Sequence, residues 1–358
     1  MTATNSPVLP GRLGNPDMTL KDDPRADPRM LAAMAPIGLD VAQEPLPFDH
    51  TAPLDALYEY CNMSEAGFGE LGGILVGGLP PVAGVTSTVE VIRGTDNNDI
   101  TLFIHRPTNA EGPLPGILHL HGGGMVILEA ASAGYVRWRD ELAATGMVVV
   151  GVEFRNGGGK LGPHPFPAGL NDCSAALQWV TDNKANLGIS KLVVSGESGG
   201  GNLTLATTLK AKAEGKIDQI DGVYAQCPYI SGVYAERDPN LTSLYENDNY
   251  FLACTQMAVM VTVYDPTGEN SKNPLAWPYH ATSDDLTGLP PHVISVNQLD
   301  PLRDEGIAYY RKLTDAGVSA VCRTVNGTCH AGDCLFREAM PDVYLSTIRE
   351  IKSFAASL

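Results

Sequence analysis

The chain has 358 residues, of which 44% are hydrophobic and 18% are charged, so it has enough apolar material for one large domain or two ordinary ones. Its net charge of -17 and its pI of about 4.8 argue against a nucleic-acid or membrane partner, because phosphate groups would be repelled. Seven scattered cysteines without a C-x-x-C pair favour neither a disulfide framework nor a zinc ribbon. We therefore expect a soluble globular protein in a reducing compartment.

Residues 1 to about 30 are rich in proline, aspartate and glycine, so we expect them to be mobile or to lie on the surface, with order beginning near Pro28. The first residues, Met1–Ser6, lack the pattern of a signal peptide, and no apolar run has the length of a membrane span, which predicts a cytoplasmic location. From Met30 to about Leu75, short helical patterns alternate with proline and glycine breaks. This region predicts a small helical element that packs on another part of the chain.

A regular pattern starts near Val85. Two alternating runs, at 85–92 and 100–105, flank an Asp96-Asn97-Asn98 turn and predict an antiparallel hairpin. Further strands are expected at 116–121, 147–154, 191–195, 222–226, 292–297 and 320–325. Helices are expected at 132–144, 168–183, 199–214, 303–316 and 341–356. Apolar strands that alternate with amphipathic helices predict a mostly parallel sheet, eight strands in all, covered by helices on both faces.

About sixty residues separate the strand ending near Cys227 from the one beginning near His292, which is too long for a single crossover. Its aromatic and methionine side chains have two interpretations, as core packing or as the lining of an apolar pocket. In the second, residues 229–278 form a cap insertion over the carboxyl edge of the sheet, and residues 1–84 contribute to this cap. Residues 85–228 and 279–358 then form the main α/β domain. The side chains concerned are Tyr229, Tyr234, Tyr245, Tyr250, Phe251, Met257, Met260, Tyr264, Trp277 and Tyr279.

The motif with the clearest chemistry is Gly196-Glu197-Ser198-Gly199-Gly200, which lies between an apolar strand and a helical pattern. This is the G-x-S-x-G pattern of a nucleophilic serine on a tight turn, where glycines permit a strained backbone. Such a serine needs donors for the oxyanion that forms when it attacks a carbonyl. The glycine run after the first parallel strand, His121–Met125, supplies candidates. We predict an oxyanion hole formed by the N–H groups of Gly123, Gly124 and Gly199.

An acid and a base are expected after later strands. Asp300 lies at the end of the strand at 292–297, whereas the nearby Asp304 and Glu305 are explained by the first turn of a helix, where acids are favoured. His330 follows the last strand. The chain order Ser198, Asp300, His330 is the order of a nucleophile, an orienting acid and a general base in this kind of fold.

Other residues near the site have alternative roles. His119 and His121 alternate on one strand and are expected to be structural, although His121 is placed to brace the glycine loop. Glu197 is expected to point away from the substrate and to support the site by hydrogen bonding. A metal site is the less favoured alternative for one crowded segment, since a closed site normally draws ligands from two segments. Its candidate ligands are Cys329, His330, Asp333 and Cys334.

From about residue 85 to the end, these motifs together resemble the hormone-sensitive-lipase group of α/β-hydrolases. The resemblance implies an α/β-hydrolase fold with a helical cap, ester hydrolysis by Ser198, Asp300 and His330, and no cofactor or metal. Within the group, the cap region resembles a bacterial esterase. The elbow departs from the common Asp-Ser-Ala, with Glu197-Ser198-Gly199 in its place. The segments that carry the resemblance are 121–124, 154–155, 164–169, 196–202, 246–251, 264–269, 276–279, 300–306 and His330.

We therefore expect a serine carboxylesterase that acts on a small-molecule ester through an acyl-enzyme. One alternative is a lactonase acting on a bulky macrocyclic lactone of the brefeldin type. The other is a non-catalytic ligand-binding protein on a hydrolase scaffold, against which the joint presence of serine, acid and base argues. The sequence leaves the oligomeric state open, with a homodimer as one alternative.

Overall fold

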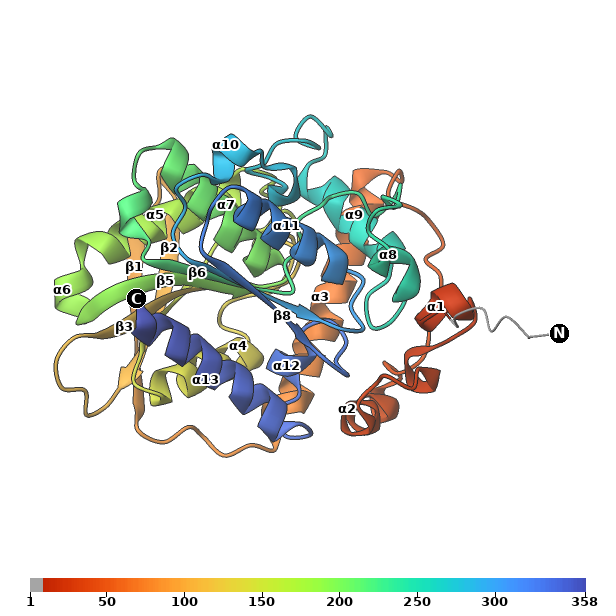
Figure 1. Cartoon of the computed structure of the whole chain (residues 1–358), viewed down its shortest axis with the longest axis horizontal. Coiled ribbons are helices and arrows are strands. Elements are labelled where there is room, and N and C mark those ends of the chain that lie inside the picture. The colour runs from red at the N-terminus through yellow and green to blue at the C-terminus, as the bar shows by residue number, and fades with distance from the viewer. Residues whose placement is uncertain (1–8) are drawn as a thin grey trace.

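The computed structural model describes residues 9–358, which are built around one eight-stranded sheet (Figure 1). The strand order is β1-β2-β4-β3-β5-β6-β7-β8. The pairs β1/β2 and β2/β4 are antiparallel and the remaining pairs are parallel, so the expected mostly parallel sheet is confirmed. The strands are β1 (Val85–Arg93), β2 (Asp99–Pro107), β3 (Leu114–Leu120), β4 (Val148–Glu153), β5 (Ile189–Glu197), β6 (Gly222–Gln226), β7 (His292–Asn297) and β8 (Ala320–Val325).

Helices cover both faces of the sheet. Figure 1 shows α4 (Ala133–Ala144) and α13 (Pro341–Ser357) on one face. On the other face lie α5 (Ala168–Asp182), α7 (Gly199–Ala213) and α11 (Arg303–Asp315). The long elements agree with the sequence-based bounds because their apolar periodicity is strong. Short elements complete the two layers: α6 (Lys184–Leu187), η3 (Ile217–Gln219), η4 (Pro278–His280), α10 (Ser283–Leu286) and α12 (Gly332–Leu335).

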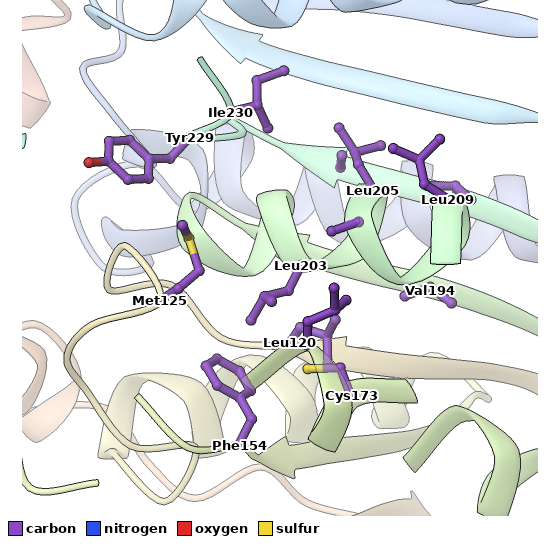
Figure 2. Packing of buried hydrophobic residues seen from close by; sticks show 14 of the residues in the cluster. Leu120, Met125, Phe154, Cys173, Val194, Leu203, Leu205, Leu209, Tyr229 and Ile230 are labelled. Atoms are coloured by element: carbon purple, nitrogen blue, oxygen red, sulfur yellow. The ribbon is translucent and has the colours of Figure 1, made fainter. Parts of the chain in front are cut away.

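Helix α7 is the central element of the core, and nearly all of its 15 residues are buried. In Figure 2, Leu203 of this helix points toward Leu120 and Phe154, whereas Leu205 and Leu209 leave another side of the helix. A helix buried on nearly all sides belongs to the interior, and α7 buries small and hydroxyl side chains such as Thr204 and Thr208 beside its leucines. Each such leucine contributes roughly 1.5–3 kcal/mol by leaving water, so the start of α7, which follows Ser198, is firmly fixed.

The N-terminal segment is ordered earlier than the sequence suggested. The expectation that order begins near Pro28 is wrong, because Leu20 is fully buried in an apolar cluster with Met30, Tyr250 and other residues. This burial explains why the segment is held on the surface of the fold. The expectations for Met1–Ser6 and for mobility before residue 9 lie outside the described residues. The elements here are α1 (Gly11–Gly14), η1 (Leu20–Asp22), α2 (Pro28–Met34) and η2 (Ala35–Ile37).

Helix α3 (Leu54–Gly77) is one continuous helix of 24 residues, so the expected alternation of short helical pieces with breaks holds before residue 54 but is wrong from Leu54 onward. Its glycines lower helix propensity, but packing of its buried face against α4 and α9 (Cys254–Tyr264) outweighs that cost. Figure 1 shows α3, α9 and the short α8 (Ser243–Glu246) at one end of the sheet. Across residues 9–358, no helix combines the length and apolar character that a bilayer span requires.

Candidate active site

Ser198 occupies the turn between β5 and α7 with a strained backbone, at φ 57° and ψ −119°. Such a conformation persists only where surrounding bonds enforce it. The Ser198 N–H donates to the carbonyl of Gln226 at 3.0 Å, and its carbonyl accepts the N–H of Tyr229 at 3.1 Å. The side chain is therefore presented at the end of β5 by a fixed backbone.

Gly196 and Gly200 are required here because β3 lies against the turn. A Cβ atom on Gly196 would lie 2.3 Å from the carbonyl oxygen of Leu120, and one on Gly200 would lie 1.9 Å from the same atom. Strain at the serine, expected from the sequence, is one reason for these glycines. The structure adds close approach of a neighbouring strand as the physical reason.

The structure brings His330 and Asp300 together. The imidazole Nδ1 lies 2.8 Å from Asp300 Oδ2, and Asp300 is fully buried with its other oxygen accepting the N–H of Leu302 at 2.9 Å. Ser198 and His330 line the same cavity, although no hydrogen bond joins the hydroxyl to the imidazole within residues 9–358. Serine–base hydrogen bonds are often long before substrate binds.

Asp304 and Glu305 occupy the first turn of α11, as the sequence predicted, and serve other contacts. Asp304 accepts the Ser243 N–H at 2.8 Å. Glu305 is buried and accepts hydrogen bonds from the Ile230 N–H and the Tyr234 hydroxyl. Burial raises the pKa of Glu305 to about 8 despite these hydrogen bonds. Neither carboxyl group competes with Asp300 for His330.

The glycine loop after β3 lies against the serine turn. A Cβ atom on Gly199 would lie only 2.5 Å from the backbone nitrogens of Gly124 and Met125. Gly123 and Gly124 line the same cavity as Ser198. In the described part of the chain, the N–H groups of Gly123, Gly124 and Gly199 have no protein acceptor, which leaves them free to donate to a ligand.

Glu197 and His121 contact the start of this loop. One Glu197 oxygen accepts the Gly122 N–H at 2.9 Å and the other lies 3.1 Å from His119 Nε2. The His121 ring stacks on Phe154 with 4.1 Å between centroids. Burial lowers the pKa of His121 to about 3, so this histidine is neutral at pH 7. Their contacts agree with the supporting roles expected from the sequence, which stay predictions.

A metal site at 329–334 is not assembled. Among the described residues, the one group of clustered candidate ligand atoms is Cys227, Asp300 and His330, within 4.8 Å of one another. Burial raises the pKa of the Cys227 thiol well above its ordinary value, and a neutral thiol is a poor metal ligand. The Nδ1 of His330 is already occupied by Asp300. Hydrogen bonding between acid and base therefore explains this cluster.

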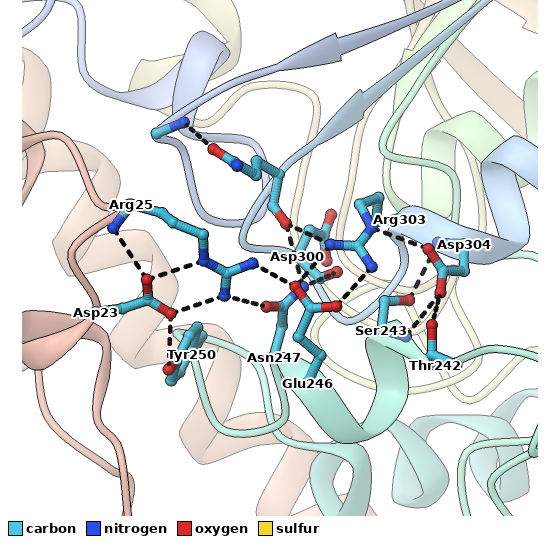
Figure 3. A network of polar contacts seen from close by, with 12 residues as sticks. Asp23, Arg25, Thr242, Ser243, Glu246, Asn247, Tyr250, Asp300, Arg303 and Asp304 are labelled. Atoms are coloured by element: carbon cyan, nitrogen blue, oxygen red, sulfur yellow. Dashed lines mark hydrogen bonds and ion pairs between the residues drawn. The ribbon is translucent and has the colours of Figure 1, made fainter. Parts of the chain in front are cut away.

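A polar network fixes the loop that contains Asp300, residues 298–302, between β7 and α11 (Figure 3). The sequence did not reveal this network. Asn247 Nδ2 donates to the carbonyl of Asp300 at 3.1 Å. The adjacent Glu246 binds Arg303 through two hydrogen bonds of 2.9 Å and also binds Arg25 of the N-terminal segment. Residues distant in sequence meet here, and only tertiary structure shows that they do.

The cavity above Ser198 is apolar, with a volume of about 150 Å³. Helix α3 forms one wall with Tyr60, Phe68 and Gly72. The two interpretations of the 229–278 side chains apply to different residues. Tyr229, Phe251, Met257 and Met260 line the cavity. Tyr234, Tyr250, Tyr264 and Trp277 are buried in the core without lining it.

Comparisons with known proteins agree with this architecture. Two curated relatives are an arylesterase from Saccharolobus solfataricus, 30% identical over 60% of this chain and 67% of the relative, and carboxylesterase NlhH from Mycobacterium tuberculosis, 34% identical over 62% and 67%. The solved structure of esterase Est22 covers 95% of this chain and 99% of its own, with 35% identity and a TM-score of 0.83.

The solved structure of brefeldin A esterase, described as a bacterial homologue of human hormone-sensitive lipase, is 46% identical with a TM-score of 0.95. It covers 98% of this chain and 99% of its own. The resemblance inferred from the motifs and the cap region is therefore confirmed. A family model for the alpha/beta hydrolase fold matches residues 117–332, and the chain belongs to this family.

Proposed function

We propose that the protein is a serine carboxylesterase. The observation that carries this proposal is the hydrogen-bonded pair His330–Asp300 facing the same cavity as Ser198 on its strained turn. The relatives named as esterases and carboxylesterases support the reaction class. The free N–H groups of Gly123, Gly124 and Gly199 support an oxyanion hole.

In the proposed reaction, His330 Nε2 takes the hydroxyl proton as Ser198 Oγ attacks the ester carbonyl. Asp300 holds the imidazole in the tautomer with the proton on Nδ1. The negative charge on the carbonyl oxygen is stabilised by the three glycine N–H groups, and in measured enzymes the loss of one such donor costs about 10²–10³ in kcat. His330 then protonates the leaving alcohol. Water, deprotonated by His330, attacks the acyl-enzyme and releases the acid.

Ser198→Ala tests this assignment. We expect its hydrolysis of p-nitrophenyl acetate to fall on the order of 10⁴-fold or more, because no nucleophile remains. Ser87→Ala is the matched control, since Ser87 is exposed on β1 and does not line the cavity, and it should stay near wild type. A fluorophosphonate probe should label the wild type and the control but not Ser198→Ala. Turnover of Ser198→Ala within tenfold of wild type would refute the proposal.

A second candidate is hydrolysis of a macrocyclic lactone of the brefeldin type, favoured by the 46% identity to brefeldin A esterase. The cavity of about 150 Å³ argues for a smaller ester, because pockets for drug-sized ligands occupy roughly 300–1,000 Å³. A panel of p-nitrophenyl esters from acetyl to dodecanoyl, run beside a macrolactone, separates the two. Higher kcat/KM for the macrolactone than for every ester would establish the lactonase.

We also propose that residues 229–278 form a cap insertion to which the segment 1–84 contributes, because α3 and α9 supply cavity walls and lie beside each other. In this arrangement Ser198 determines the reaction and the cap determines which ester is accepted. The seven cysteines are free thiols, which supports a reducing, cytoplasmic location.

A further inference from the structure

The loop from His121 to Ala131, named the oxyanion loop here, connects β3 to α4 and contains the proposed oxyanion donors Gly123 and Gly124. Carboxyl groups from three different elements accept its backbone N–H groups. These are Glu197 from Gly122 at 2.9 Å, Glu65 from Leu128 at 2.7 Å and Glu153 from Ala130 at 2.6 Å. The two proposed donors therefore lie on a segment that is fixed at both ends.

The backbone of the 121–131 segment is strained, so it requires stabilising contacts. Met125 has φ 60° and Leu128 has φ 78°, in the left-handed region that side chains other than glycine rarely adopt. Strained backbone of this kind persists only when surrounding contacts enforce it, and it gathers at functional sites. The hydrogen bond from Leu128 to Glu65 acts at one of the two strained residues.

Glu65 is notable among the three because it belongs to α3, outside the sheet. Its side chain is buried, and its second oxygen accepts the N–H of Lys160 at 2.8 Å. Lys160 belongs to the loop between β4 and α5, residues 154–167, which also contacts the 121–131 segment, since the Gly157 N–H donates to the carbonyl of Met125 at 2.9 Å. One carboxyl group thus joins α3 to two loops that pack against each other.

Helix α3 also forms a wall of the substrate cavity through Phe68 and Gly72. We propose that Glu65 is a positioning residue that fixes the oxyanion loop to α3, so that the placement of the cavity wall and of the oxyanion donors is coupled. The proposal rests on the esterase function above. Glu65 touches neither the substrate nor Ser198 and acts through the backbone of Leu128 and Lys160.

Glu65→Gln is the sharpest variant because the side chain keeps its shape. Its carboxamide has one acceptor oxygen and one donor nitrogen, so one of the two N–H groups, of Leu128 or Lys160, faces another donor. Glu70→Gln is the matched control, since Glu70 is an exposed residue of the same helix. Gly159→Ala is a second variant that disturbs the Glu65 hydrogen bonds. The new Cβ atom would lie 2.8 Å from both Glu65 oxygens and would displace the carboxyl group without removing it.

The experiment measures kcat and KM for p-nitrophenyl acetate per active site, with sites titrated by a fluorophosphonate. Inhibition by an alkyl trifluoromethyl ketone, which forms a tetrahedral oxyanion adduct with the serine, gives a second readout. We expect Glu65→Gln to lose kcat by about tenfold to a hundredfold, as displaced catalytic groups do, with KM within about threefold of wild type. The ketone inhibition constant should rise in parallel, and Glu70→Gln should match wild type.

A kcat for Glu65→Gln within twofold of wild type would overturn the proposal, as would a loss confined to KM, which would make Glu65 a cavity-wall residue only. Should Glu65→Gln fail to fold, an unchanged kcat in Gly159→Ala overturns it. Failure of the esterase function itself is recognised separately, because wild-type activity would then be absent or would survive in Ser198→Ala.

Discussion

Glu246→Gln is expected to destabilise the fold strongly, because Glu246 links the N-terminal segment to the loop of Asp300. Its buried carboxylate accepts two hydrogen bonds of 2.9 Å from Arg303 and one from Arg25. Both arginine side chains are largely covered, at 15% and 21% exposed. Glutamine keeps the shape but removes the charge, so Arg25 and Arg303 lose the carboxylate that joins them and keep only their pairs with Asp23 and Asp304.

The expected loss is about 2 kcal/mol, since leaving a buried charge without its partner typically costs about 3–5 kcal/mol, and the remaining pairs with Asp23 and Asp304 and the partial exposure of the arginines reduce this cost. The pH dependence of the unfolding free energy provides a second test of this contribution. Burial alone would raise the pKa of Glu246, but hydrogen bonds from Arg303 and Arg25 outweigh it and lower the pKa. The contribution of Glu246 to the unfolding free energy is therefore fully present above its pKa in the unfolded chain, about 4.3. This contribution is lost as the pH falls through the lower pKa of Glu246 in the folded state.

Urea unfolding of wild type and variant at pH 7 and pH 4 measures both effects. The difference in unfolding free energy should be largest at pH 7 and should shrink at pH 4 or below. Glu214→Gln is the matched control, because Glu214 pairs with Lys210 and Lys216 on the surface, where such pairs contribute about 0–1 kcal/mol. A loss of less than 1 kcal/mol in Glu246→Gln at pH 7 would refute the reasoning.

Two further predictions concern the serine turn and a buried acid. Gly199→Ala should fold but lose at least about tenfold in kcat for p-nitrophenyl acetate, because the new methyl lies 2.5 Å from the Gly124 nitrogen and displaces the oxyanion loop; an unchanged kcat would contradict this. Burial raises the pKa of Glu305 to about 8, so the folded state retains a proton that the unfolded state releases, and stability should fall as pH rises from about 4 to 8. Glu305→Gln should flatten that slope in urea unfolding, and an equal slope in both proteins would exclude Glu305 as its source.

The sheet and its covering helices were predictable because strong local patterns encode them. Continuous apolar runs such as 148–152 in β4 and the amphipathic periods of α5 and α11 identify their elements wherever they pack. The continuity of helix α3 was not predicted because its glycines are local helix breakers, whereas its stability comes from contacts with α4 and α9. A signal was present, since Leu57, Cys61 and Glu65 recur every four residues and mark one buried face.

The sequence by itself determined the proposed nucleophile, acid and base, because Ser198 on a glycine turn, Asp300 and His330 each follow a recognisable strand of one sheet. Parallel strands bring their carboxyl ends to one edge, so chain order alone indicates that these groups meet. Only the tertiary structure decided what holds them in place. Glu65 binds Leu128 across 63 positions of sequence and Arg25 binds Glu246 across 221, and such contacts depend on how elements pack rather than on any local pattern.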